Sequence, residues 1–428
     1  MKMIKSSAAG FEKLFQKLRF REGAHSPELL AAVAKIVDDV AASGDRALLK
    51  YIKKFDGYAP AAAELEATPA EKKKALAEVK PQEVSIIKSA ARRIERYHRC
   101  QVAHGYKIRP ETGVELEQRI LPLHRVGIYA PGGKASYPST ILMAAIPARI
   151  AGAEEIVLVS PAPAGKLNPY IAAAAEISGV HRIFKIGGAQ AVAALAYGTE
   201  TIPQVDKIVG PGNAYVAAAK KMVFGQVDID MIAGPSEVVV IADVKANASF
   251  AAADMLAQIE HDEMAAALLL TPSETFAITV YREIRRQIKT SVRKKIIEKS
   301  LARYCAIIIT GSLDEAVNIA NRFAPEHLEL MTQSPDKILK KVRNAGSVFL
   351  GSYTPEALGD YLAGTNHILP TGGTARFSSP LGVYDFYKRM SVLSFSRKAF
   401  EKLSRPTADF ARMEGLDAHA HSVLIRGK

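Results

Sequence analysis

The middle of the chain alternates between short apolar runs and longer segments in which apolar residues recur at helical spacing. The apolar runs have the length of buried strands, and the segments between them have the length of helices. The predicted strands are 126–129, 155–160, 182–186 and 207–209, and the predicted helices are 138–150, 168–177, 190–197 and 215–223. Such alternation favours a parallel sheet with helices on both faces.

A second series of the same kind begins near residue 237. Its predicted strands are 237–242, 265–271, 306–310, 327–331 and 347–350, and its helices include 249–260 and 313–323. Gly234-Pro235 separates the two series. We therefore expect an α/β protein with two α/β domains joined near this dipeptide, which suits a chain of 428 residues.

The two ends of the chain have a different pattern. Residues 1–24 predict an isolated, basic, partly helical arm. Ser26 and Pro27 are typical of a helix start, and this helix is expected to stop at Gly44. The tail, 381–428, is expected to be helical with breaks near Pro406 and Gly415.

A carboxylate and an imidazole stand side by side after Pro325. Proline disfavours helical geometry in the residue before it, so the helix 313–323 should end there. Glu326 and His327 would then lie at the start of a short strand. A carboxylate can activate water and an imidazole can move protons near neutral pH, although such a pair also occurs as a solvated acid beside a surface histidine.

Four glycine-rich turns come after predicted strands of the first series. They are 131–133, 187–190, 210–213 and 234–236. In a parallel sheet they should share the carboxyl edge, where open α/β folds bind ligands. None completes the dinucleotide fingerprint G-x-G-x-x-G, because Tyr215 stands where the last glycine belongs. The turns therefore permit a nucleotide without indicating one.

Composition narrows the cellular setting and the class of partner. The formal charge is +13, but the basic residues lie mostly on predicted amphipathic helices and no aromatic-basic strip accompanies them, which argues against nucleic acid. A positive field can still attract an anionic cofactor. The apolar runs are too short for a membrane span, and no signal peptide is expected. With only Cys100 and Cys305, a reducing cytoplasm is favoured.

Several scattered side chains could hold a metal ion. Gln258 and His261 are three apart on one predicted helix and share a face. Asp360 follows a strand, and His419 lies on the tail. Two imidazoles with oxygen donors would suit zinc or a similar divalent ion. Spacing alone leaves open that these histidines are ordinary surface or capping residues.

At this point the chain resembles the histidinol dehydrogenase family, from about residue 26 to 427. The resemblance rests on motifs that occur in family order and at family spacing. They lie at 125–134, 187–190, 209–213, 230–237, 260–262, 324–329, 359–367, 369–373 and 414–419. Ile259 is a slight departure, because a smaller residue is expected between the matched positions 258 and 261.

The resemblance implies a role for each matched position. One zinc per subunit would be bound by Gln258, His261, Asp360 and His419, and NAD⁺ would contact Tyr129, Gln190 and Asn213. Ser236, His367 and Glu414 match substrate contacts, which the zinc ligands and the catalytic pair would complete. Glu326 and His327 match that pair. The activity implied is oxidation of L-histidinol through L-histidinaldehyde to L-histidine with two NAD⁺, the last two steps of histidine biosynthesis.

The resemblance also implies a fold and an assembly. It comprises two incomplete Rossmann-like domains with parallel sheets flanked by helices, plus small helical terminal segments. We expect one domain at 25–128 and 237–380, the other at 129–236, an arm at 1–24 and a tail at 381–428. The family forms an intertwined homodimer in which each tail reaches the other subunit's site.

Three other functions remain open on sequence grounds. A related zinc and NAD dehydrogenase could act on another small alcohol. A zinc hydrolase could use the same ligands with a water activated by Glu326, but would not need the turns at Gln190 and Asn213. A protein without catalytic activity would leave Glu326 and His327 without a role.

Overall fold

The computed structural model describes residues 1–21, 26–132 and 137–427. The chain divides into two compact units. Unit 1 comprises Met1–Gln101 and His124–Phe386, and unit 2 comprises Val102–Leu123 and Tyr387–Lys428. Gly133 and Lys134, which belong to the first predicted turn and motif, lie outside the described residues, as does the predicted boundary at 24–25.

Unit 1 contains two sheets in which every neighbouring pair of strands is parallel. One has the order β1-β11-β10-β9-β12-β13 and the other β6-β5-β4-β7-β8. The strands of the first are β1 (Lys2–Lys5), β9 (Glu237–Ala242), β10 (Ala266–Thr271), β11 (Cys305–Ile309), β12 (His327–Met331) and β13 (Ser347–Leu350). Those of the second are β4 (Arg125–Tyr129), β5 (Glu155–Val159), β6 (Arg182–Phe184), β7 (Lys207–Val209) and β8 (Asp228–Ile229). The α/β class with parallel sheets is confirmed.

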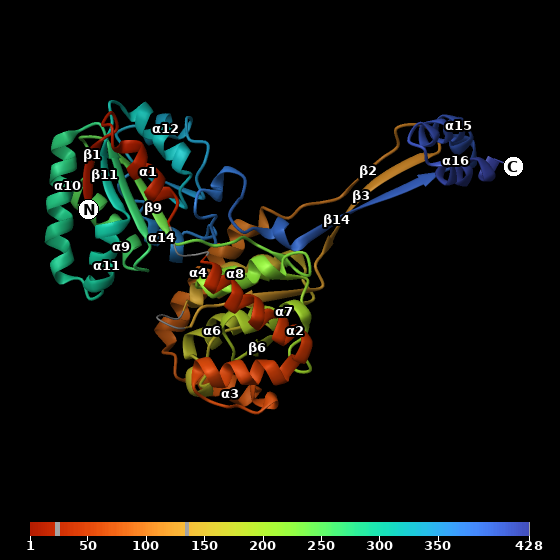
Figure 1. The fold of residues 1–428 in the computed structure, drawn as a ribbon, viewed down its shortest axis with the longest axis horizontal. Helices are drawn as coiled ribbons and strands as arrows, with labels where there is room; N and C mark the ends of the chain where they lie inside the picture. The colour runs from red at the N-terminus through yellow and green to blue at the C-terminus, as the bar shows by residue number, and fades with distance from the viewer. Residues whose placement is uncertain (22–25, 133–136, 428) are drawn as a thin grey trace. The chain divides into compact units, whose positions relative to one another are not determined.

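Helices cover both faces of the six-stranded sheet, since its strands are apolar on both sides. The helices α9 (Ala248–Ile259), α10 (Glu274–Gln287) and α11 (Lys294–Arg303) pack on one face. On the opposite face lie α1 (Phe11–Arg19) and α12 (Leu313–Phe323), as Figure 1 shows. The hydrophobic core of this sheet therefore forms two layers, one on each side.

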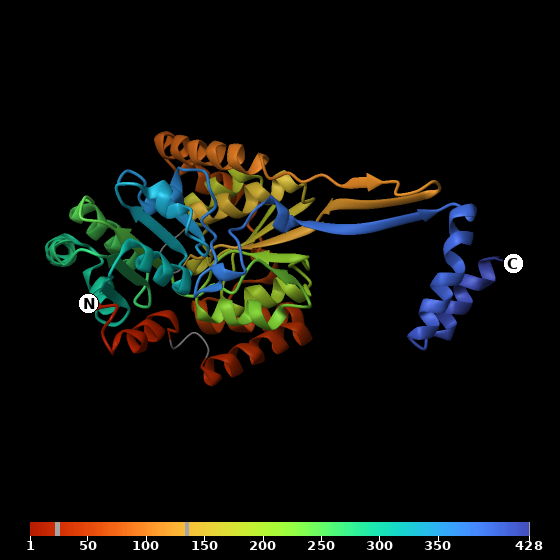
Figure 2. The ribbon, with the colours of Figure 1, turned by 90° about the horizontal axis from the view of Figure 1, so that it is seen from above.

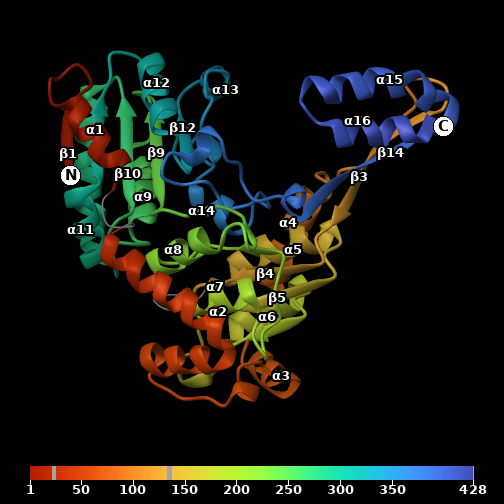
Figure 3. The same cartoon turned by 45° about the vertical axis from the view of Figure 1, so that its right-hand side comes forward.

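The five-stranded sheet is covered in the same way. On one face α2 (Pro27–Asp56) packs beside α7 (Gly188–Tyr197) and α8 (Ala214–Val223), as Figure 3 shows. On the other are α5 (Pro138–Ala151) and α6 (Pro169–Ser178), which connect β4 to β5 and β5 to β6. Further helices of unit 1 are α3 (Pro69–Ala77), α4 (Pro81–Arg99), α13 (Pro335–Leu339), α14 (Glu356–Tyr361), η1 (Ala62–Glu64), η2 (Pro163–Gly165), η3 (Ile288–Thr290), η4 (Thr374–Arg376) and η5 (Val383–Phe386).

The N-terminal segment differs from an isolated arm. β1 pairs with β11, and α1 buries Phe11, Phe15 and Leu18 against the six-stranded sheet. The next helix, α2, resumes after a kink at Gly44, where φ is +49°, instead of ending there. Its buried face shares a core with β5 and β6, whereas the sequence grouped residues 25–128 with 237–380. The domain boundaries themselves stay a prediction.

Unit 2 consists of an antiparallel sheet and two helices. The sheet pairs β2 (Tyr106–Ile108) and β14 (Tyr387–Phe395) with β3 (Val114–Pro122), and it is followed by α15 (Arg397–Met413), α16 (Asp417–Leu424) and η6 (Ile425–Gly427). Figure 2 shows β14 running alongside β3. The tail is thus partly a strand, because its first residues find a partner in β3, 265 or more residues earlier. Pro406 lies inside α15, whereas Gly415 does separate the two helices.

No helix in the part of the chain that the structure describes combines the length and the apolar character needed to cross a membrane.

Candidate functional site

A cavity in unit 1 receives side chains from both sheets. The turn at Gly210 and Pro211 follows β7, at the carboxyl edge of the five-stranded sheet. Ser236, Glu326 and His327 stand at the starts of β9 and β12, at the amino edge of the six-stranded sheet. The turn 234–236 was expected at the carboxyl edge with the others. It leads into β9 and therefore lies at the amino edge of the six-stranded sheet.

The segment that carries Glu326 and His327 has the predicted local structure. The helix α12 ends at Phe323, Ala324 adopts a left-handed conformation with φ +53°, and β12 begins at His327. Both predicted bounds are therefore confirmed. The two side chains are buried, with exposed fractions of 7% for Glu326 and 4% for His327. A solvated surface pair is excluded.

Both side chains contact the main chain of Glu237. The N–H of Glu237 donates to Oε2 of Glu326 at 3.0 Å, and its carbonyl oxygen lies 3.3 Å from Nδ1 of His327. The Nε2 atom of His327 has no hydrogen-bond partner among the described residues and is 4.0 Å from Oδ1 of Asp360. An unpaired imidazole nitrogen at a cavity is available to a ligand.

Burial shifts the titration of both groups. It lowers the pKa of His327 to about 4, so the imidazole is neutral at neutral pH and can accept a proton. Burial, reinforced by the nearby Glu237 carboxylate, raises the pKa of Glu326 well above its ordinary value, although the N–H of Glu237 opposes that rise. A carboxylate made more basic in this way is a better general base for water.

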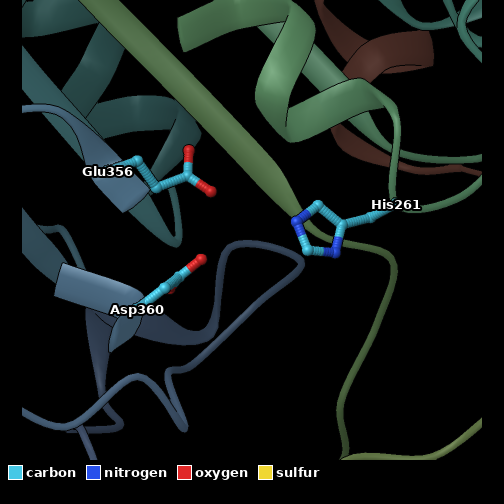
Figure 4. Close-up of side chains that lie close together, drawn as sticks. All are labelled: His261, Glu356 and Asp360. Carbon is cyan, nitrogen blue, oxygen red and sulfur yellow. The ribbon is translucent and has the colours of Figure 1, made fainter. Parts of the chain in front are cut away.

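Three potential metal ligands lie close together in the cavity. Ligand atoms of His261, Glu356 and Asp360 are within 4.8 Å of one another. Figure 4 shows the His261 imidazole, just beyond the end of α9, facing the carboxylates of Glu356 and Asp360 on α14. His261 and Asp360 were predicted ligands. Glu356 was missed, although it stands four residues before Asp360 and so shares its helix face.

The amide of Gln258, also a predicted ligand, is almost fully buried beside this cluster. The Gln258 amide makes hydrogen bonds with its neighbours when its nitrogen points toward them. That nitrogen is then 3.0 Å from Nδ1 of His327 and 3.0 Å from each carboxylate oxygen of Glu356. The Nδ1 atom of His327 can thus accept from Gln258 or donate to the Glu237 carbonyl, and these alternatives correspond to the two tautomers of the ring. Glu356 fixes the orientation of the Gln258 amide in either case.

His367 closes another side of the cavity. Its Nδ1 atom donates to the main-chain oxygen of Asp360 at 2.9 Å, and its Nε2 atom is 3.4 Å from the Thr140 hydroxyl. Burial lowers the pKa of His367, so this ring is also held neutral. The segment after β13, which includes α14, therefore brings two of the predicted site residues, Asp360 and His367, together.

The residues matched to NAD⁺ contacts lie at the carboxyl edge of the five-stranded sheet. Tyr129 ends β4, and its buried hydroxyl accepts a hydrogen bond from the N–H of Gly188 at 3.1 Å. Gln190 is buried in the first turn of α7, and Asn213 caps the start of α8. The turn before Asn213 needs glycine, because Gly210 has φ +110° and a Cβ there would lie 2.2 Å from the Tyr129 carbonyl oxygen.

The remaining two predicted residues belong to unit 2. Glu414 follows the last residue of α15, and His419 lies on α16. Both side chains are exposed. The cavity of unit 1 brings together the other predicted ligand and substrate residues, namely Ser236, Gln258, His261, Glu326, His327, Asp360 and His367.

Known proteins resemble the chain along its whole length. The family model described as "Histidinol dehydrogenase" matches residues 20–427. The histidinol dehydrogenase of Geobacter sulfurreducens is 50% identical over 429 residues and 100% of both chains. That of Aquifex aeolicus is 51% identical over 395 residues and 92% of both chains. The crystal structure of the histidinol dehydrogenase from Elizabethkingia anophelis covers 100% of this chain and 98% of its own, with a TM-score of 0.92 and 36% identity.

Proposed function

Because the chain belongs to the histidinol dehydrogenase family, which serves histidine biosynthesis, we propose that it oxidises L-histidinol through L-histidinaldehyde to L-histidine with two NAD⁺ and one zinc ion per subunit. The observation that carries the proposal is the buried Glu326–His327 pair beside the donor cluster of His261, Glu356 and Asp360. Two proton-transfer groups and a set of metal donors in one cavity are what two successive oxidations at one centre require.

In the first oxidation His327 acts as the base. Its neutral imidazole takes the hydroxyl proton of the alcohol at Nε2, the ring atom without a partner among the described residues. The Glu237 carbonyl supports the tautomer in which Nδ1 carries the ring proton and Nε2 is free to accept one. In each oxidation NAD⁺ would accept the hydride that leaves the substrate carbon.

In the second oxidation Glu326 activates water. Its carboxylate removes a proton as the water oxygen adds to the aldehyde carbon, which gives the hydrated form from which a second hydride can leave. His327 again accepts a hydroxyl proton. The raised pKa of Glu326 makes it a stronger base for this task, and burial of the site protects the aldehyde from side reactions.

The donor set fits a divalent cation. An imidazole, a carboxylate and an amide oxygen, from His261, Asp360 and Gln258, suit zinc, and His419 would complete the set. Zinc, when bound, would orient the substrate through its imidazole and amino nitrogens. Glu356 would then not bind the metal itself. It would accept hydrogen bonds from the Gln258 amide nitrogen and so keep the amide oxygen of Gln258 pointing away from the Glu356 carboxylate.

Cofactor and substrate would approach from different sides. We assign the NAD⁺ contacts to Tyr129, Gln190 and Asn213, at the edge of the five-stranded sheet where nucleotides bind in open α/β folds. Ser236 and His367 would contact the substrate within the cavity, and Glu414 would do so from the tail. The four zinc ligands and the catalytic pair complete the substrate site.

Unit 2 supports the proposal of an intertwined homodimer in which the tail of one subunit serves the site of the other. Taken alone, its described residues bury few side chains, and Leu393, Phe410 and Met413 are 66%, 64% and 81% exposed. Large apolar side chains left exposed in a small unit that buries few of its side chains are typical of an interface. A cytoplasmic enzyme fits the two free cysteines, Cys100 and Cys305.

A single assay tests the proposed reaction. Purified protein is given zinc, NAD⁺ and L-histidinol, and NADH is counted for each histidine formed. Two NADH per histidine support the proposal. NADH from other small alcohols but not from histidinol would instead indicate a related dehydrogenase, and turnover without NAD⁺ would indicate a hydrolase.

A further inference from the structure

We infer that Arg21 and Glu237 form a positioning pair that holds the main chain under both catalytic side chains. The inference rests on the proposed roles of Glu326 and His327 and adds two residues to which the family resemblance assigned nothing. It also gives the N-terminal segment, which looked like an isolated arm in the sequence, a part in catalysis.

The main chain of a single residue, Glu237, contacts both catalytic side chains. The N–H and the carbonyl oxygen of Glu237 reach Glu326 and His327, respectively. These contacts follow from strand register, since β9 and β12 are neighbours and His327 pairs with Val238. A shift of the Glu237 backbone would therefore move the hydrogen-bond partners of both side chains at once.

The Glu237 side chain is itself held by hydrogen bonds from two other parts of the chain. Its carboxylate accepts from Nη2 of Arg21 at 2.7 Å and from the N–H of Gly372 at 3.0 Å. The same Arg21 nitrogen donates to the carbonyl oxygen of Pro235 at 2.6 Å. Arg21 therefore ties the N-terminal segment to the strand start that carries Ser236 and Glu237, and Gly372 ties in the loop after His367.

The ion pair of Arg21 and Glu237 is buried, so removing either side chain would disturb the structure around it. The two side chains are only 2% and 1% exposed. Loss of one partner leaves the other charge buried without compensation, which the structure can relieve only by moving backbone or admitting water. A displacement of the order of 1 Å at a catalytic group can slow a reaction by about 100-fold.

The test compares kcat for L-histidinol and for L-histidinaldehyde in Arg21→Met, in Arg21→Lys and in the unchanged protein. We expect Arg21→Met to lower kcat in both half-reactions by about 10- to 100-fold, with zinc content and the Kd for NAD⁺ nearly unchanged. Arg21→Lys keeps a cation near Glu237 and should recover part of the rate. Loss in both half-reactions distinguishes this role from that of Glu326.

Arg182→Met is the matched control. Arg182 also pairs with a glutamate, since its Nε and Nη2 donate to the Glu66 carboxylate at 3.0 and 2.7 Å, but this pair stands at the amino edge of the five-stranded sheet, away from the cavity. Its loss should lower the unfolding temperature without changing kcat per folded molecule. A purely structural Arg21 would give the same result as this control.

Folded, zinc-loaded Arg21→Met with kcat within about twofold of the unchanged protein in both half-reactions would overturn the inference. If Arg21→Met does not fold, the same criterion is applied to Arg21→Lys, and a kcat within about twofold of the unchanged protein in both half-reactions would overturn the inference. Failure of the proposed function is a separate outcome, because the unchanged protein would then make no NADH from histidinol, or Glu326→Gln and His327→Asn would leave both half-reactions intact.

Discussion

The side chains of Glu326 and His327 are adjacent in sequence, yet Oε2 of the carboxylate and Nδ1 of the imidazole lie 3.8 Å apart, beyond hydrogen-bonding distance. Each is held separately, by the N–H and the carbonyl oxygen of Glu237. Two groups that do not share a proton in the resting site can act in different steps. This suits the proposal that His327 is the base in both oxidations and that Glu326 activates water in the second.

Replacement of Glu326 by Gln is expected to slow aldehyde oxidation by about 100-fold or more and alcohol oxidation much less, because only the aldehyde must add water. His327→Asn should slow both. The measurement is the single-turnover rate of NADH formation from each substrate. If Glu326→Gln lowered the rates of both half-reactions equally, Glu326 would not be the group that activates water.

Loss of a proposed zinc ligand should abolish zinc binding while NAD⁺ still binds. The variants are His261→Ala and His419→Asn, and the readouts are metal content after dialysis and NAD⁺ titration. His421→Asn is the control, since His421 lies two residues from His419 on α16 and so faces another direction. Stoichiometric zinc in either ligand variant would refute that ligand.

Glu356→Gln is expected to weaken zinc binding by about 10- to 100-fold, because its carboxylate fixes the Gln258 amide beside the metal donors. The zinc Kd is measured by competition with a chelating dye, and Glu66→Gln serves as the control. An unchanged Kd would mean that Gln258 is held without Glu356. Complete loss of zinc would instead make Glu356 a direct ligand of the His261 and Asp360 cluster.

Two inactive variants should restore activity when their subunits are mixed, if each site takes its tail from the partner. In heterodimers of Glu326→Ala and His419→Ala, one of the two sites regains both residues. Unfolding and refolding the mixture should give about a quarter of the normal activity with random pairing. Activity no higher than that of the separate variants would place Glu326 and His419 of one site in one chain.

Asp254→Asn should stabilise the protein above pH 6. Burial raises the pKa of Asp254 to about 6 from an unfolded value near 3.8, so its contribution to stability is full below pH 3.8 and is lost as pH rises through 6. We expect a gain of about 1 kcal/mol at pH 8, discounted because the side chain is half-buried, and little gain at pH 4. Denaturant midpoints at both pH values measure it, with exposed Asp38→Asn as the control.

The elements that depend on neighbouring residues were predictable. Helical spacing followed by Pro325 fixed the end of α12 at Phe323 and the start of β12 at His327. The repeated strand-helix pattern likewise predicted the parallel sheets. The adjacent carboxylate and imidazole after Pro325 marked Glu326 and His327 as candidates, and the cavity does contain them. These features follow from side-chain periodicity and backbone sterics, which act over a few residues.

Other features depend on which strands become neighbours, and no local pattern encodes that. β14 pairs with β3 and β1 pairs with β11 only through long-range contacts, so the tail was predicted as helical and the N-terminal segment as an isolated, partly helical arm. Glu356 joins His261 because α14 packs near the end of α9. Glu237 meets Glu326, 89 residues away, because β9 and β12 pair in a register that places them opposite each other.

The sequence determined the catalytic side chains, and tertiary packing determined the main-chain groups that hold them. A backbone N–H or carbonyl has the same chemistry at every residue, so it gains a role only from its position.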